Sequence, residues 1–108
     1  MRPTLLALLF LLAGCSFNER ADAIVELAPD LSNGEALYEQ ECSRCHASDA
    51  RGNDLGPNLV SELHHGDKQF ITWILDGKNP PEMPAFGDDF TDQDTADVMG
   101  WLHALAEQ

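Results

Sequence analysis

Apolar side chains recur at helical spacing along the second half of the chain. Between residues 67 and 76 they predict a helix that begins with Asp67 as its N-cap and stops at Gly77. A second run follows Thr91, which has Asp94 three residues after it, and this pair is a helix-start signal. The apolar positions of the second run are Val98, Met99, Leu102, Leu105 and Ala106. We therefore expect two amphipathic helices here.

An earlier helix is expected from Ser32. Ser32 and Glu35 form a capping-box pattern, and the helical run continues toward Cys42. Residues 47–66 are interrupted by Gly, Pro and Asn, which predicts a loop. No stretch alternates with the period of two that is typical of a strand, so the predicted fold class is all-α.

The first 14 residues have the pattern of an export signal. Arg2 supplies a positive charge, and an apolar run from Leu5 to Ala13 follows it. This run is much shorter than the ~20 residues that a membrane-spanning helix needs. We therefore predict a signal peptide over residues 1–14 and export to the periplasmic side of a bacterial membrane.

The end of this run, Leu12-Ala13-Gly14-Cys15, resembles the lipobox of bacterial lipoproteins. The resemblance implies that Cys15 becomes the lipidated first residue of the mature chain, anchored by several acyl chains. An ordinary cleavage site is the alternative, and Ala21-Asp22-Ala23 offers one far from the apolar run.

These features divide the chain into three segments. The predicted signal peptide is followed by a lipidated N-terminus and tether over residues 15–30. The folded domain is expected over residues 31–108. A domain this small buries little apolar surface and usually needs a disulfide, a metal or a cofactor for stability.

The charge of the chain is strongly acidic. Six Lys and Arg stand against 19 Asp and Glu, for a net charge of -13. Nucleic acid is therefore not an expected partner, because phosphate binding needs clustered basic residues. The acidity suits a partner protein with a basic docking patch, or serves only solubility.

Candidate chemistry is concentrated in Cys42-Ser43-Arg44-Cys45-His46, a C-x-x-C-H motif typical of c-type haem attachment. The two thiols can reach the two vinyl groups on one edge of a porphyrin, and His46 then lies where it can bind iron. A thioredoxin-type pair is disfavoured because no βαβ pattern surrounds the motif. A structural zinc site would want a second Cys pair. The motif predicts one haem c, covalently attached through Cys42 and Cys45.

Around this motif the chain resembles the class I cytochrome c family, from about residue 31 to residue 108. The features that carry the resemblance are Gly34 and Tyr38 before the motif, Gly56-Pro57-Asn58-Leu59 after it, the Met83-Pro84-Ala85-Phe86 loop, and Trp101 with Leu102. The resemblance implies three to four helices wrapped around one haem, with the last helix crossing the first near Gly34.

The second iron ligand is predicted to be Met83, because the family's iron-binding Met lies in a Met-Pro-x-Phe loop. Pro84 restricts Met83 to extended backbone, so a stiff loop holds the thioether. Met99 is expected in the core instead. The remaining candidate ligands are expected to be surface or partly exposed residues; they are His64, His65 and His103.

Two further residues are predicted to border the haem. The resemblance assigns the carbonyl of Pro57 as the acceptor for the second ring N–H of His46. Trp73 is either a haem-pocket aromatic or a core residue of its helix. Arg51 and Lys78 could pair with haem propionates, although isolated surface charges are the simpler interpretation.

Iron held by His46 and Met83 would have no open position for a substrate. We therefore predict an electron carrier, not an enzyme, that performs one-electron transfer in a respiratory or similar redox chain. The alternatives are a haem-bearing subunit of a larger oxidoreductase complex and a haem ligand sensor. The expected partners are redox proteins, with the chain as a monomer or as a subunit of a redox complex.

Overall fold

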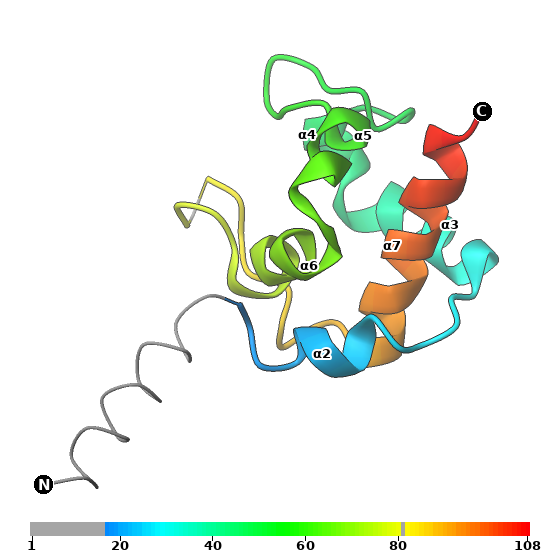
Figure 1. The fold of residues 1–108 in the computed structure, drawn as a ribbon. Helices are drawn as coiled ribbons and strands as arrows, with labels where there is room; N and C mark the ends of the chain where they lie inside the picture. Colours follow the sequence, from blue (N-terminus) through cyan, green and yellow to red (C-terminus); the bar gives the residue numbers. More distant parts are fainter. Residues whose placement is uncertain (1–16, 81) are drawn as a thin grey trace, which may run out of the picture.

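The structure is a computed structural model, and it describes residues 17–80 and 82–108 (Figure 1). The predicted signal peptide and Cys15 lie outside the described residues. The helices are α2 (Ala21–Ile24), α3 (Leu31–Glu41), α4 (Ser43–His46), α5 (Leu59–Glu62), the 3₁₀ turn η1 (Leu63–His65), α6 (Asp67–Asp76) and α7 (Asp92–Ala106). In this part of the chain, extended backbone pairs only at one isolated bridge, Lys78 with Met83. The all-α prediction is confirmed.

Helices α3 and α7 pack side by side, and Gly34 is the reason they can approach so closely (Figure 1). A Cβ atom at Gly34 would lie 2.0 Å from the backbone oxygen of Asp97 and 3.1 Å from Cβ of Trp101. One turn further along α3, the ring of Tyr38 lies 4.7 Å from the ring of Trp101, between centroids. The predicted crossing near Gly34 is therefore confirmed.

The two later helices begin and end close to the predicted residues. The Thr91 side chain accepts from the Asp94 N–H, and the Asp94 side chain accepts from the Thr91 N–H, a complete capping box at the start of α7. Helix α6 stops at Gly77, whose φ of +81° favours glycine. Its N-cap is Gly66, one residue before the predicted Asp67.

The predicted cap of the first helix is wrong. Helix α3 begins at Leu31, and the N-cap is Asp30, whose side chain accepts from the Asn33 N–H. Asp30 is positioned by a residue far away in the sequence, because its own N–H donates to the buried carboxylate of Asp97 at 2.7 Å. This contact between segments far apart in sequence outweighs the local Ser32–Glu35 pattern.

The predicted loop over residues 47–66 contains two short helices near its end. Asn58 caps α5 by accepting from the Ser61 N–H at 3.1 Å, and η1 follows directly. Single turns of this length carry too little apolar periodicity to be predicted.

Part of the predicted tether packs onto the helices. Ala21 and Ile24 of α2 are each 1% exposed, against α6 and α7. The Arg20 guanidinium donates to the carboxylate of Asp92 and to the carbonyls of Gly87 and Phe90, at 2.7–2.8 Å. The structure therefore places α2 on the packed body, not in a free linker. Among the described residues, no helix has the length and apolar character needed to cross a membrane.

Candidate functional site

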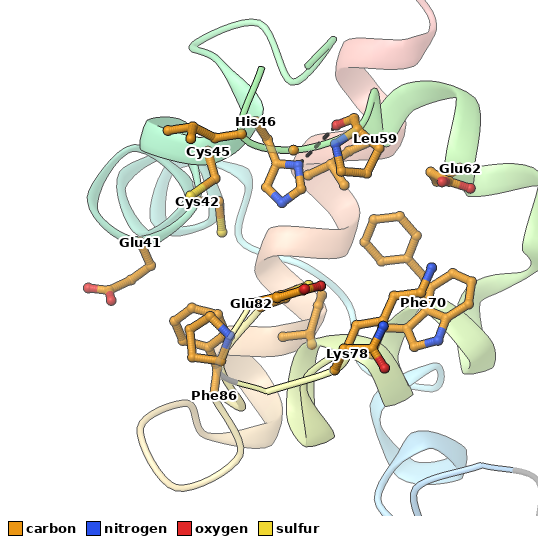
Figure 2. A pocket seen from close by; sticks show the side chains of 18 residues that line it. Glu41, Cys42, Cys45, His46, Leu59, Glu62, Phe70, Lys78, Glu82 and Phe86 are labelled. Carbon is orange, nitrogen blue, oxygen red and sulfur yellow. Dashed lines mark hydrogen bonds between the residues drawn. The ribbon is translucent and has the colours of Figure 1, made fainter. Parts of the chain in front are cut away.

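A cavity of about 330 Å³ lies between α4, α5, α6 and the loop over residues 78–86 (Figure 2). All the predicted cofactor-binding residues of the described chain line it; they are Cys42, Cys45, His46, Pro57, Trp73 and Met83. Further apolar side chains in the lining are Leu55, Leu59, Phe70, Ile74, Pro84 and Phe86. The fold thus brings together residues that are 41 positions apart in the sequence, counting from Cys42 to Met83.

The short helix α4 and its N-cap residue, Cys42, present three of these side chains within about one turn. Cys42 ends α3, and its carbonyl accepts from the N–H groups of Cys45 and His46 at 3.2 and 3.0 Å. Both thiols are unpaired. Burial raises the pKa of Cys42 to about 12, with added repulsion from Glu41 and Cys45, so this thiol is neutral at neutral pH in the haem-free chain.

His46 is 7% exposed, and its ring has a defined orientation. Nδ1 lies 2.9 Å from the carbonyl oxygen of Pro57, so Nδ1–H donates and Nε2 keeps its lone pair. Figure 2 shows this second nitrogen directed into the cavity. The geometry is that of a metal-ligating histidine oriented by a backbone carbonyl.

Gly56 makes this approach possible, a steric role that was not predicted from the sequence. A Cβ atom there would lie 2.7 Å from the carbonyl oxygen of Cys45 and 2.9 Å from Nδ1 and Cε1 of His46. Only a residue without a side chain fits between the ring and the loop. The Gly56-Pro57 pair is the feature of the sequence from which this role could have been predicted.

The backbone just after His46 is held by Tyr38. Ala47 adopts a φ of +71°, which is unfavourable for a residue with a side chain. Its carbonyl accepts a hydrogen bond from the Tyr38 hydroxyl. Burial raises the pKa of Tyr38 well above its usual value, so the hydroxyl remains a donor at any physiological pH.

The loop that carries Met83 forms the opposite wall. Lys78 and Met83 exchange N–H···O bonds of 3.0 and 3.2 Å, which close the loop on itself. The Phe86 N–H donates to the carbonyl of Ile74 at 2.9 Å and so attaches the loop to α6. Figure 2 shows Glu82 and Phe86 across the cavity from His46. Met83 itself is half-buried and lines the cavity.

Trp73 forms part of the cavity wall on the α6 side. Its ring is half-buried, and Nζ of Lys78 lies 4.3 Å from the ring centroid, a cation–π contact. Lys78 also lines the cavity, whereas Arg51 is exposed and lies outside the lining.

The other candidate iron ligands lie elsewhere. Met99 is 4% exposed and belongs to the hydrophobic core. His64 and His65 are exposed on η1, and Nε2 of His103 lies 2.7 Å from a carboxylate oxygen of Asp67. Among the described histidines and methionines, only His46 and Met83 line the cavity.

The residues present fit a covalently attached haem. Two thiols and an imidazole lone pair meet at one edge of a largely apolar cavity, and cofactor pockets are mostly apolar and of this size or larger. Leu55 is 71% exposed although it lines the cavity, so a flat apolar group there would cover it. The charged groups in the lining are Glu41, Glu62, Lys78 and Glu82.

Known proteins resemble this chain in sequence and in structure. A profile of the family described as cytochrome c oxidase, cbb3-type, subunit III, matches residues 29–102. The cbb3-type cytochrome c oxidase subunit CcoP of Rubrivivax gelatinosus is 32% identical over 95 residues, which cover 82% of this chain and 30% of that protein. Cytochrome c6 of Porphyra purpurea is 30% identical over 91 residues, 78% of this chain and 79% of that protein.

The structural comparison points the same way. Cytochrome cL from Hyphomicrobium denitrificans matches with a TM-score of 0.60 and 27% identity, over 68% of this chain and 45% of that one. The chain therefore spans less than half the length of both the Hyphomicrobium cytochrome cL and the Rubrivivax subunit.

Proposed function

This chain belongs to the class I monohaem c-type cytochromes, and from that premise we propose that it transfers single electrons with its iron held between His46 and Met83. Members of this family bind haem c covalently, so this chain holds one haem c through Cys42 and Cys45. The family is one of electron carriers. The haem supplies an iron that takes up and releases one electron.

The observation that carries the ligand assignment is the orientation of His46. Its Nδ1–H is committed to the Pro57 carbonyl, so Nε2 is the only ring nitrogen free to bind iron. The opposite wall is the loop of Met83, the only thioether of the described residues in the cavity lining. Iron bound by both His46 and Met83 would have no position open for a substrate. A His and Met pair also raises the reduction potential relative to two histidines.

Carbon monoxide tests this assignment. The reduced, haem-loaded protein is expected not to bind carbon monoxide, and Met83→Ala is expected to bind it, because the substitution opens the sixth position. Met99→Leu is the matched control, since Met99 lies in the core and should leave the iron closed. Rapid binding by the unsubstituted protein would contradict the assignment and support a ligand sensor.

We also propose that the chain is exported, lipidated at Cys15 and confined to the membrane plane on the periplasmic side. The N–H of Asn18 donates to the hydroxyl of Thr72 at 2.8 Å, and its amide donates to Asp76 at 2.7 Å. Asn18 follows Cys15 by three residues, and three residues of extended chain reach at most about 11 Å. A lipid at Cys15 would therefore hold the domain close to the bilayer, with α6 nearby.

Membrane fractionation tests the anchor. Cys15→Ser is expected to move the protein from the membrane to the soluble fraction, and Ser16→Ala, the neighbouring control, is expected to leave it on the membrane. An unchanged distribution of Cys15→Ser would contradict lipidation at this residue.

The redox partner is proposed to present a basic docking patch. Three of the four charged residues in the cavity lining are acidic, Glu41, Glu62 and Glu82. Electron-transfer association is then expected to slow as ionic strength rises, because salt screens the attraction between the two surfaces.

A second candidate function is that of a fixed haem-bearing subunit in a larger oxidoreductase. The family profile and the similarity to an oxidase subunit favour it. Purification from native membranes in mild detergent separates the two functions. A stable complex of fixed stoichiometry supports the subunit, and a free monomer supports the mobile carrier.

A further inference from the structure

Three metal-ligating side chains gather on the surface next to the haem cavity. Glu62 ends α5, and His64 and His65 follow it on η1. One donor atom from each residue lies within 4.8 Å of those of the other two. Nε2 of His65 is 2.8 Å from a carboxylate oxygen of Glu62, and the two imidazole centroids are 4.0 Å apart.

Both imidazoles are oriented by neighbours outside the cluster. Nδ1 of His64 lies 2.6 Å from the carbonyl of Ser61 and donates to it, which leaves Nε2 as the free donor atom of this ring. The ring of His65 packs edge-on against Trp73, with 5.1 Å between centroids. Less side-chain freedom is therefore lost when a ligand binds.

The donor set indicates the class of ligand. Two imidazole nitrogens and one carboxylate oxygen suit Zn²⁺, Cu²⁺ or Ni²⁺, whereas Ca²⁺ and Mg²⁺ prefer oxygen ligands alone. Metal–ligand bonds of about 2.0–2.2 Å bring neighbouring donors to roughly 3–3.5 Å from one another. The three donors, which lie within 4.8 Å of one another, would have to move closer to bind one ion, and the exposed histidines leave room for water ligands.

We propose that Glu62, His64 and His65 form a binding site for a divalent transition-metal ion at the rim of the haem cavity. Glu62 itself lines the cavity, and His65 contacts Trp73, which also lines it. An ion bound here neutralises an acidic group of the rim and adds positive charge beside it. It therefore raises the reduction potential of the haem. This effect on the potential rests on the proposed function, whereas the binding of the ion does not.

Calorimetric titration of the haem-loaded full chain with Zn²⁺ tests the site, because Zn²⁺ exchanges no electrons with the haem iron. We expect one ion per chain. His65→Ala and Glu62→Gln are each expected to weaken binding at least about tenfold, since loss of even an outer-shell partner has an effect of that size. The matched control is His103→Ala, which removes another exposed histidine paired with a carboxylate.

Two results would overturn the site: no saturable binding, or equal weakening by His103→Ala. Absorption and circular dichroism spectra check that each variant keeps its haem and its helices. The reduction potential is measured in the same titration. It is expected to rise in the unsubstituted protein and to stay constant in His65→Ala. A reduction potential that does not change at saturation would overturn the coupling between the ion and the haem. This result is distinguishable from a wrong assignment of the iron ligands, because the heat of Zn²⁺ binding does not depend on Met83.

Discussion

At the scale of single residues, the orientation of His46 depends on a neighbour without a side chain. Gly56→Ala would place a methyl group 2.9 Å from the imidazole and 2.7 Å from the Cys45 carbonyl oxygen. We expect a loss of about 1–3 kcal/mol in the free energy of unfolding, as for other overpacked sites. Urea unfolding of the haem-loaded protein measures it. Asp54→Ala, an exposed change in the same loop, is the control, and an equal effect of both would contradict the close packing.

Asp97 gives the stability a defined pH dependence. Burial alone would raise its pKa, but hydrogen bonds from the Asp30 N–H, Gln93 and Asn33 outweigh burial and lower the pKa below its ordinary 3.8. A lowered folded-state pKa stabilises the fold above the ordinary value, and this contribution is lost as the pH falls through the lowered one.

Thermal unfolding at several pH values tests this dependence. Asp97→Asn is expected to be less stable than the unsubstituted protein at neutral pH, and the difference is expected to shrink below pH 3.8. Glu107→Gln, an exposed acid at the end of α7, should leave the profile unchanged. A difference that is constant with pH would show that the charge of Asp97 plays no part.

The sequence predicts the site residues where their chemistry is local. Cys42, Cys45 and His46 share one turn, so their spacing alone indicates what they can bind. The hydrogen bonds of the Arg20 guanidinium, and the bond from the Asp30 N–H to Asp97, cannot be predicted in this way, because the partners lie 67 to 72 residues apart. Such contacts exist only after the helices have packed.

At the scale of elements, the contact between α3 and α7 is the most sensitive to volume. Gly34→Ala would place a methyl group 2.0 Å from the backbone oxygen of Asp97, and backbone cannot rotate away as a side chain can. We expect the helices to separate and the free energy of unfolding to fall by about 3 kcal/mol or more. Glu35→Ala, at the exposed neighbouring position, is the control. An unfolding midpoint in urea that is the same for both variants would contradict the close contact of α3 with α7 at Gly34.

Element boundaries follow the sequence where caps are local. Thr91 and Asp94 bond to each other within one turn, and the start of α7 could therefore be predicted. The start of α3 could not, because Asp30 is positioned by Asp97 on another helix. The short α5 and η1 were missed for a different reason: a single turn has no period to detect.

At the scale of the whole molecule, the segment before α3 is bonded to the loop that leads into α7 and to the start of that helix. Arg20→Ala removes three hydrogen bonds to residues 87–92, and we expect a loss of about 1–3 kcal/mol in stability. Lys68→Ala breaks only an exposed ion pair with Asp22 and should cost less than about 1 kcal/mol. Chemical unfolding compares the two. A larger effect of Lys68→Ala would contradict the role of Arg20 as the stronger of the two contacts.

The domain boundary was the least predictable large feature. Residues 16–30 have charged residues and no broad apolar face, which is typical of a linker. Two small apolar contacts and one arginine are nevertheless enough to place Ala21 and Ile24 in the core. Such a boundary depends on the shape of the rest of the molecule and not on its own sequence pattern.

The central claim is that this cytochrome holds its iron between His46 and Met83. The most direct test is the absorption spectrum of the oxidised, fully matured protein, recorded beside Met83→Ala. We predict an iron–sulfur charge-transfer band in the unsubstituted protein and its complete loss in the variant, with covalent haem retained in both. A band that survives Met83→Ala, or a matured protein that never shows one, would contradict the claim.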